Sequence, residues 1–183
     1  MEQINQVILI VGRRGSGKTD YTRSLMAASS LKKLVVDTLA HPKYADLPRI
    51  SPEQVKRWRS GNYKMFGSNF AEMWSALQTV KNSLVVLEDA TKYIKSTTSL
   101  PDDVVAFLVD SKQNNNHVVI IYHGFGMVPR DLFRLCDIIV CFKTNEVLNE
   151  YRRKIPNFPA VAAAYARVEK SRNNYAREEV LIS

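Results

Sequence analysis

The sequence predicts an α/β fold in which helices flank a parallel β-sheet. Five short apolar segments alternate with helical or polar segments, which is the pattern of strands joined by crossover helices. The first apolar segment runs into a glycine-rich loop, and a helical pattern follows that loop. Because no repeat, linker or low-complexity tract interrupts the pattern, we expect residues 1–183 to form a single domain.

The strands and helices follow in the order that such a fold requires. The predicted strands cover residues 7–11, 34–37, 84–88, 118–122 and 138–142, which are apolar and too short for typical helices. The predicted helices cover residues 20–29, 70–80, 101–113 and 159–168, and Pro101 opens the third. A short edge strand at 61–67 and a final strand at 175–182 complete the prediction.

The composition is typical of a compact cytoplasmic protein. No apolar stretch approaches the roughly 20 residues of a membrane span, and the charged N-terminus does not resemble a secretory signal. Cys136 and Cys141 belong to no metal-ligand pair, so we expect reduced thiols in the core. We expect the core of the domain at about residues 4–145, with a C-terminal helix and a possible strand in 146–183.

The charge favours a polyanionic partner. The net charge is +8 and the pI is about 9.5, although any protein that holds phosphates tends to be basic. Basic residues gather in the last third of the chain: Arg152, Arg153, Lys154, Arg167, Lys170, Arg172 and Arg177. They form either a binding surface or a solvated basic tail.

The loop after the first strand fits the pattern G-x-x-x-x-G-K-[ST], the phosphate-binding loop or Walker A motif. In this motif glycines let backbone N–H groups turn toward phosphate, the lysine neutralises the outer phosphates, and the hydroxyl holds Mg²⁺. We assign nucleotide binding to this loop and the residue after it: Gly12, Arg13, Arg14, Gly15, Ser16, Gly17, Lys18, Thr19 and Asp20. Lys18 is also a predicted catalytic residue, and Thr19 a predicted metal ligand.

Two adjacent carboxylates, Glu88 and Asp89, follow the third strand and resemble a Walker B motif. Open α/β sheets bind their ligands at this end of the strands. ATP hydrolysis needs one carboxylate to organise hydrated Mg²⁺ and another to position the attacking water. By position, Glu88 serves the metal and Asp89 the water. The alternative is a pair of acids that begins a solvated loop.

A third group of polar residues follows the fourth strand. His123 stands where a side chain can touch the γ-phosphate, so it either senses ATP hydrolysis or is a hydrogen-bonded histidine at a strand end. Arg130 and Arg134 are candidate arginine fingers, whose guanidinium stabilises charge on the transferring phosphate. Either could instead be an ordinary surface arginine.

Together these features resemble HerA/FtsK-type P-loop ATPases. The resemblance covers about residues 4–145 and rests on an extra strand between the Walker A and Walker B strands, the carboxylates on strand three, and the Pro129-Arg130 segment. Asp37 and the segment 41–44 also look like the family's sequence after strand two. The family usually carries Gln at the position of His123. The small size is similar to that of viral genome-packaging ATPases and zonular-occludens-toxin-like phage assembly ATPases.

The resemblance implies a Mg²⁺-dependent ATPase that forms a homo-oligomeric ring and moves DNA through a central pore. ATP would lie at each subunit interface, with an arginine supplied by the neighbour. A viral packaging motor would lie in the host cytoplasm or on the virion and could contact a capsid vertex or membrane-associated viral proteins. Residues suited to sequence-independent contacts with the DNA backbone are Lys56, Arg57, Trp58, Arg59, Lys64, Lys92, Tyr93 and Lys95. Trp58 could instead be packed in the core.

Three other functions fit parts of the pattern. One is a phage assembly or secretion ATPase, and another is a small nucleotide or metabolite kinase of similar length. A kinase needs an arginine-rich lid and an acceptor pocket, whereas the segment after strand four offers only Arg130 and Arg134. The last is a non-catalytic, nucleotide-gated assembly factor, which the intact Lys18, Thr19, Glu88 and Asp89 argue against.

Overall fold

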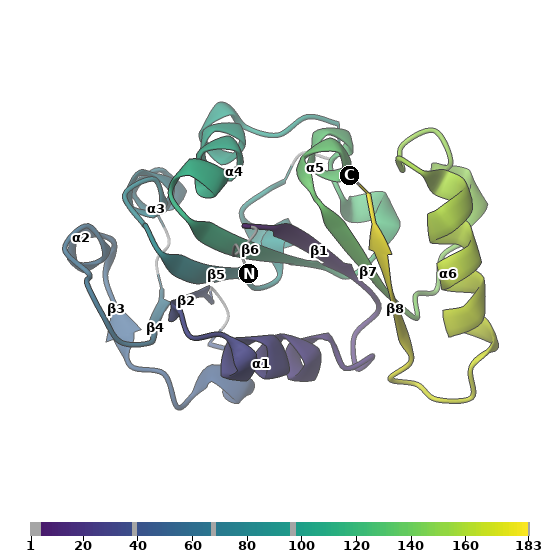
Figure 1. Ribbon diagram of the computed structural model, residues 1–183, viewed down its shortest axis with the longest axis horizontal. Helices are drawn as coiled ribbons and strands as arrows, with labels where there is room; N and C mark the ends of the chain where they lie inside the picture. The colour runs from purple at the N-terminus through teal and green to yellow at the C-terminus, as the bar shows by residue number, and fades with distance from the viewer. Residues whose placement is uncertain (1–4, 38–39, 67–68, 96–97, 183) are drawn as a thin grey trace.

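A computed structural model describes residues 5–37, 40–66, 69–95 and 98–182 of the chain. These residues form an eight-stranded sheet with the strand order β3-β4-β2-β5-β6-β1-β7-β8 (Figure 1). The strands from β3 to β7 in this order pair in parallel, and β8 pairs antiparallel to β7. The predicted α/β fold with a parallel sheet is therefore confirmed, with one antiparallel strand at its edge.

The elements have the following bounds. The strands are β1 (Val7–Val11), β2 (Lys32–Val36), β3 (Arg49–Ile50), β4 (Tyr63–Met65), β5 (Ser83–Leu87), β6 (Asn116–Tyr122), β7 (Ile138–Phe142) and β8 (Arg177–Leu181). The α-helices are α1 (Lys18–Ala28), α2 (Pro52–Val55), α3 (Phe70–Leu77), α4 (Asp102–Gln113), α5 (Arg130–Leu135) and α6 (Phe158–Lys170). Short 3₁₀ helices are η1 (Pro42–Tyr44), η2 (Ala90–Lys92), η3 (Phe125–Met127) and η4 (Leu148–Tyr151).

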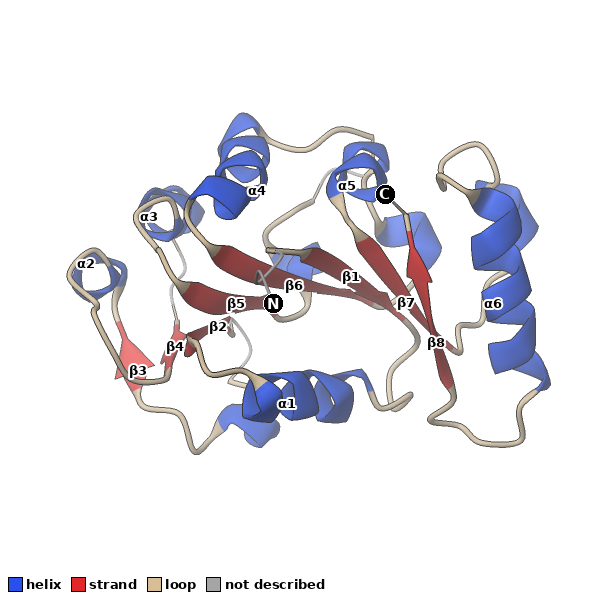
Figure 2. Ribbon diagram, viewed as in Figure 1, coloured by secondary structure: helices blue, strands red, loops and turns tan. Residues whose placement is uncertain are grey.

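Helices cover both faces of the sheet, as Figure 2 shows: α1 lies on one face, and α3, α4 and α5 lie on the other. Alternate residues of β1 therefore enter different layers. Val7 and Leu9 belong to the larger core cluster, with residues of α3 to α6. Ile8 belongs to the smaller cluster, with Tyr21 and Met26 of α1. Coverage of both faces explains why the central strands read as continuous apolar runs rather than as alternating ones.

The structure confirms most of the predicted elements and adds others. The edge strand predicted at 61–67 is β4, and the final strand predicted at 175–182 is β8; residue 67 lies outside the described residues. The extra strand expected between the Walker A and Walker B strands is β6, which separates β1 from β5. Elements outside the prediction are the two-residue β3 and the short helices α2 and α5. The helix predicted at 70–80 is shorter than expected, because α3 ends at Leu77.

Two predictions about the core are also confirmed. Cys136 and Cys141 are buried and unpaired, and burial raises the pKa of each thiol to about 12. Trp58 is packed rather than exposed: its indole Nε1 donates to the Ser60 carbonyl at 2.7 Å, and the Lys32 ammonium lies 4.1 Å from the ring centre. Within the described residues, no helix is long and apolar enough to cross a membrane.

Candidate active site

The glycine-rich loop connects the carboxyl end of β1 to the first turn of α1. Gly12 packs so closely that a Cβ atom there would lie 2.4 Å from Cβ of Phe142 on β7. Gly17 has φ of +93°, a left-handed conformation that favours glycine, and it immediately precedes α1. The first N–H groups of a helix have no partner within it, and its positive dipole end attracts anions. The loop therefore places unpaired N–H groups where an anion can bind.

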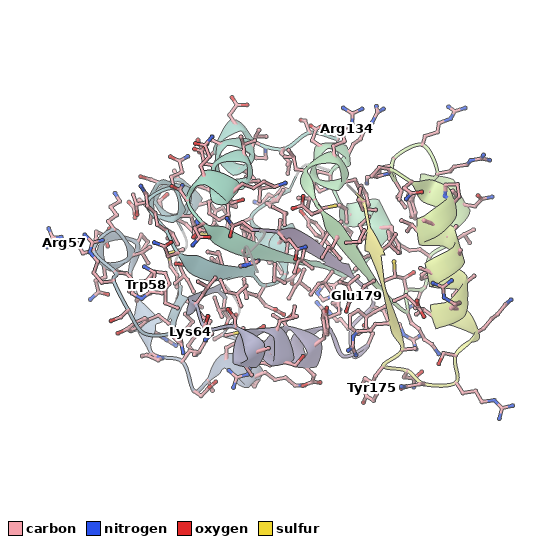
Figure 3. The ribbon with its side chains drawn as sticks, in the orientation of Figure 1. Arg57, Trp58, Lys64, Arg134, Tyr175 and Glu179 are labelled. Carbon is pink, nitrogen blue, oxygen red and sulfur yellow. The ribbon has the colours of Figure 1, made fainter. Side chains whose placement is uncertain are left out.

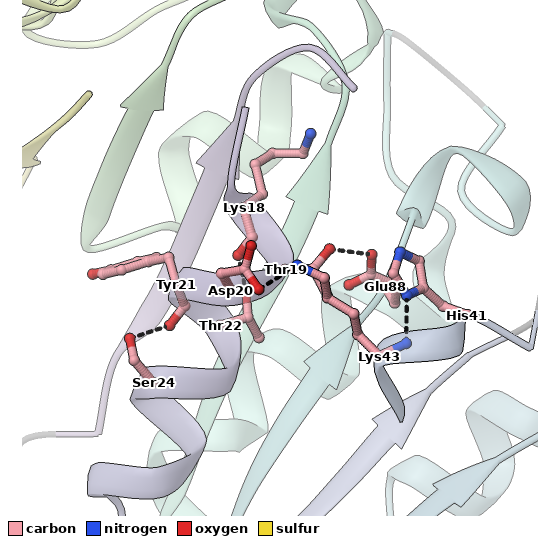
Figure 4. A network of polar contacts seen from close by, with 9 residues as sticks. All are labelled: Lys18, Thr19, Asp20, Tyr21, Thr22, Ser24, His41, Lys43 and Glu88. Atoms are coloured by element: carbon pink, nitrogen blue, oxygen red, sulfur yellow. Dashed lines mark hydrogen bonds and ion pairs between the residues drawn. The ribbon is translucent and has the colours of Figure 1, made fainter. Parts of the chain in front are cut away.

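Lys18 is buried at the start of this helix, and its side chain rises toward the loop (Figure 4). Its ammonium donates to the Arg13 carbonyl at 2.8 Å, and the Ser16 hydroxyl donates to the same carbonyl at 2.8 Å. Burial lowers the pKa of Lys18 to about 8, while the carboxylates of Glu88 and Asp89 oppose that shift. A charged lysine without water around it favours an anionic ligand.

A cavity of about 540 Å³ opens beside the loop, within the usual range for small-molecule sites. It brings together most of the predicted site residues: Arg14, Gly15, Gly17, Lys18, Thr19, Asp20, Glu88, Asp89 and His123. Of the remaining loop residues, Gly12 and Ser16 are buried, and Arg13 donates to the Asn145 side chain at 3.1 Å. The Walker A and Walker B segments thus meet in one cavity, although β6 separates their strands in the sheet.

Glu88 follows β5 and is buried between two hydroxyl groups. The Thr19 hydroxyl donates to Oε1 at 3.4 Å, and the Tyr44 hydroxyl donates to Oε2 at 3.1 Å (Figure 4 shows the Thr19 contact). Burial raises the pKa of Glu88, against the opposing effects of His41, Tyr44 and Lys18. The two predicted metal ligands, Thr19 and Glu88, are therefore neighbours.

Asp89 adopts a left-handed backbone conformation, with φ of 45° and ψ of 61°. Such a conformation is uncommon outside glycine and is typical of functional sites. Its Oδ1 accepts a hydrogen bond from the Thr91 hydroxyl and lies 3.5 Å from Nε2 of His123. Burial alone would raise the pKa of Asp89, but His123 and Thr91 outweigh burial and lower it to about 2. The carboxylate is thus ionised and aimed at His123.

His123 follows β6 and faces the cavity rather than the core. Its Nδ1 atom is buried and has no hydrogen-bond partner in the described part of the chain. The loop after it is held in place by Glu146, whose carboxylate accepts from the N–H groups of Phe125 at 2.5 Å and Gly126 at 2.9 Å. Lys154 donates to the carbonyls of the same two residues. The histidine therefore stands on a fixed turn beside Asp89.

Some cavity residues were assigned no role from the sequence. Asp37, His41, Lys43 and Tyr175 also line the cavity. The sequence of segment 41–44 indicated only a resemblance to the HerA/FtsK-type ATPases. Its Tyr44 is not among the residues that line the cavity, but the Tyr44 hydroxyl contacts Glu88. No local signal marks Tyr175, because it precedes β8 in a polar segment far from the Walker motifs.

The two candidate arginine fingers lie away from this cavity. Arg130 and Arg134 are exposed on α5, and neither lines the cavity among the described residues. Arg134 lies at the molecular edge (Figure 3), where its guanidinium is 3.9 Å from the Asp131 carboxylate. Neither arginine lies in its own chain's cavity among the described residues, and a role in a neighbour's site stays a prediction.

Besides Trp58, two more of the residues predicted to grip DNA are buried, Lys64 and Tyr93, which makes their assignment wrong. The Lys64 ammonium donates to the Tyr44 carbonyl at 2.8 Å, because β4 is paired on both sides and covered by η1. The Tyr93 hydroxyl donates to the Glu88 carbonyl at 3.3 Å, and its ring packs against Phe70 and Trp74. The remaining basic residues of this set are exposed: Lys56, Arg57, Arg59, Lys92 and Lys95.

The basic residues of the last third are more than a solvated tail. Arg167 donates to the Glu178 carboxylate at 2.9 Å, and the Arg177 guanidinium lies 4.6 Å from the centre of the Tyr21 ring. Lys154 holds the turn after β6, as described above. These contacts give part of the basic surface a structural role within the chain.

No model of a known protein family matches the sequence, and no curated protein matches it. Solved structures do share the fold. The genome packaging NTPase B204 from Sulfolobus turreted icosahedral virus 2, in complex with ATP-γS, superposes with a TM-score of 0.80 at 14% identity, covering 99% of this chain and 94% of that one. B204, the DNA-packaging ATPase from Sulfolobus turreted icosahedral virus, gives 0.74 at 15% identity, covering 97% and 92%.

The N-terminal domain of zonular occludens toxin from Neisseria meningitidis is also similar. Its TM-score is 0.50 at 17% identity, and the match covers 78% of each chain. The predicted resemblance to viral packaging ATPases and zonular-occludens-toxin-like proteins is therefore confirmed at the level of the fold. The match to B204 extends over nearly the whole of both chains, including α6 and β8.

Proposed function

We propose that this chain is a Mg²⁺-dependent ATPase that translocates DNA and packages a viral or phage genome into a capsid. One observation carries the proposal: the Thr19 hydroxyl and Glu88 carboxylate meet in the cavity that also holds Lys18 and Asp89. The fold that this chain shares with B204 over nearly its whole length supports packaging over the other activities of P-loop proteins. Similarity to the toxin domain, which leaves more of the chain unmatched, gives less support to assembly or secretion.

The residues present fit a magnesium nucleotide. Mg²⁺ keeps most of its waters and binds through one or two protein groups together with substrate phosphates. Thr19 and Glu88 supply such a pair, and the described residues contain no group of three or more acidic, His or Cys side chains that would form a metal cage. Bound there, the ion would neutralise charge on the phosphates. The N-terminus of α1 and Lys18 would hold the β- and γ-phosphates.

Asp89 and His123 are placed to act on the attacking water. The ionised Asp89 accepts a hydrogen bond from that water and orients its oxygen toward the γ-phosphorus. The new P–O bond forms as the bond to the β–γ bridging oxygen breaks, and ADP and phosphate leave. With a pKa of about 2, Asp89 orients the water more than it removes a proton from it. His123, 3.5 Å from Asp89, reports the presence of the γ-phosphate.

The exposed basic residues provide contacts with the DNA backbone. Lys56, Arg57 and Arg59 stand at the end of α2, at the far edge of the sheet (Figure 3 labels Arg57). Lys92 belongs to η2, which begins directly after Asp89. A contact between Lys92 and DNA would therefore be transmitted to the hydrolytic carboxylate over three residues. Such contacts neutralise phosphates without reading sequence.

The complete motor is a homo-oligomeric ring. Because Arg130 and Arg134 are exposed and lie away from the chain's own cavity, either is available to a neighbouring subunit's site. A packaging ring would act in the host cytoplasm or on the virion and dock to a capsid vertex or to membrane-associated viral proteins.

Product analysis of the purified chain tests the proposal. Incubation with Mg²⁺ and ATP should release ADP and free phosphate, and Lys18→Ala should abolish the release. Lys81→Ala, an exposed lysine before β5, is the matched control and should leave the rate unchanged. Adding a nucleoside monophosphate tests the kinase alternative: phosphate transfer to it without release of free phosphate would reject hydrolysis.

Mass measurement with a slowly hydrolysed ATP analogue should show a ring, and a monomer under all conditions would contradict the motor.

A further inference from the structure

A second cavity, of about 310 Å³, adjoins the phosphate cavity. The two share Gly17, Asp20 and Tyr175, so they meet at the end of the glycine-rich loop. The volume is at the lower end of the roughly 300–1,000 Å³ typical of small-molecule sites. The second cavity is therefore within reach of a ligand whose phosphates lie in the first.

Tyr175 lines both cavities, and a hydrogen bond of its backbone helps to hold it at the end of the glycine-rich loop. Its ring packs over the loop, because a Cβ atom on Gly17 would lie 2.8 Å from Cδ1 of Tyr175. The Tyr175 N–H donates to the Asn173 side chain at 2.9 Å, and the Asn173 N–H donates to the Ser171 hydroxyl at 3.1 Å. The Lys143 ammonium anchors the Ser171 carbonyl at 2.5 Å. These hydrogen bonds hold the backbone of the segment before β8 in place without a ligand.

Tyr175 nevertheless remains 61% exposed as a residue, which is unusual for a large aromatic residue on an ordered loop. Figure 3 shows it at the lower end of β8, on the side of the molecule that carries α1. Burying an aromatic face against a flat ligand is favourable, whereas leaving it in water is not. The exposed face is therefore available for stacking.

The lining of the second cavity also includes the aromatic side chains of Tyr21 and Phe142 and the Arg177 guanidinium. The Arg177 guanidinium lies 4.6 Å from the centre of the Tyr21 ring, and the Tyr21 and Phe142 rings meet edge to face at 5.9 Å. The Tyr21 hydroxyl donates to the Glu179 carboxylate at 2.8 Å, which fixes the ring from its polar end. The lining thus combines aromatic side chains and a guanidinium with the polar Asp20 and Ser24, close to a phosphate site, and such a mixture of groups suits a nucleobase.

We propose that the second cavity is the base subsite of the nucleotide and that Tyr175 stacks on the base. The inference rests on the proposed function, because it takes the first cavity to hold the phosphates. It adds a specificity-determining residue that comes from the C-terminal segment, outside the Walker motifs. The C-terminal strand β8 and the turn before it then complete the nucleotide site as well as extending the sheet.

Calorimetry with two diphosphates in Mg²⁺ tests this assignment without requiring turnover. ADP and inorganic pyrophosphate share the phosphate contacts, but only ADP carries a base. Tyr175→Ala should weaken ADP binding by about tenfold, because base stacking on an aromatic side chain is typically of that size. It should leave pyrophosphate binding unchanged, and Tyr175→Phe should bind both as the wild type does. Leu181→Ala, at the exposed end of β8, is the control and should change neither affinity.

The possible results separate the two levels of the proposal. If Tyr175→Ala binds ADP as tightly as the wild type, or loses pyrophosphate equally, the base subsite is rejected and the nucleotide function stands. Equal wild-type affinity for ADP and pyrophosphate would reject the subsite in the same way. Lys18→Ala should weaken both ligands. If the wild type binds neither ligand, the proposed function fails and the base subsite fails with it.

Discussion

The Thr19 hydroxyl lies 3.4 Å from Oε1 of Glu88, which joins the first turn of α1 to the end of β5 across 69 residues of sequence. The register of the sheet brings these groups together, because β1 and β5 both pair with β6 and end at the same edge. The contact supports the proposal that Glu88 serves the metal and Asp89 the attacking water.

The two carboxylates should give different phenotypes. Asp89→Asn should retain Mg²⁺–ATP binding but lower kcat by about 100-fold or more, because an amide orients the water poorly. Glu88→Gln should raise the Mg²⁺ concentration needed for half-maximal activity. Titration of activity with Mg²⁺ at saturating ATP distinguishes them. The division of roles would be reversed if Asp89→Asn shifted the Mg²⁺ requirement and Glu88→Gln did not.

His123 should affect turnover more than binding. His123→Ala removes the group beside Asp89, so we expect kcat to fall by about tenfold with little change in ATP affinity. His123→Gln, which keeps a hydrogen-bonding side chain and is the residue usual in the ATPases that the sequence resembles, should recover much of the rate. Steady-state kinetics measures both constants. Equal kcat in the alanine variant and the wild type would show that the histidine is only a strand-end residue.

Lys64 should contribute to stability and not to DNA binding. Lys64→Met keeps the aliphatic contacts but leaves the Tyr44 carbonyl without its donor, so we expect a loss of about 1.5–3 kcal/mol of unfolding free energy. Chemical denaturation measures this change. The matched exposed variant Lys56→Met should leave stability unchanged and weaken DNA binding. A stable Lys64→Met protein with impaired DNA binding would contradict the buried position of the ammonium.

The finger arginine should act in trans. We expect Arg130→Ala or Arg134→Ala, whichever residue serves the neighbour, to lower kcat by about 10³-fold. Mixing that inactive variant with inactive Asp89→Asn subunits should restore activity, because the latter still supply an arginine to intact neighbouring sites. Phosphate release from the mixture is the measurement. No gain in either mixture would remove both arginines from consideration.

Much of the fold follows from local pattern. Buried parallel strands such as Val7–Val11 are apolar on both faces and so stand out as unbroken runs. The Walker A loop can be recognised because its chemistry depends on residues adjacent in sequence. By contrast, β3 is a two-residue strand whose pairing with β4 leaves no periodic signal.

The site was predicted where contacts are local and missed where they are not. Tyr44 reaches Glu88 across 44 residues, and Tyr175 reaches Gly17 from the opposite end of the chain. Lys64 and Tyr93 were assigned to DNA because basic and aromatic residues suit that role, but the composition of a segment does not reveal which side chains a neighbouring element covers. Their burial depends on η1 and on the packing of α3, respectively.

DNA-dependent ATP hydrolysis tests the central claim most directly. Phosphate release by the wild-type chain should rise several-fold on adding double-stranded DNA of unrelated sequences, and the rise should weaken as salt increases. The variant with Lys56, Arg57 and Arg59 changed to Ala should keep its basal rate and lose the stimulation. Hydrolysis that DNA leaves unchanged, together with no DNA binding at low salt, would contradict a DNA-translocating motor.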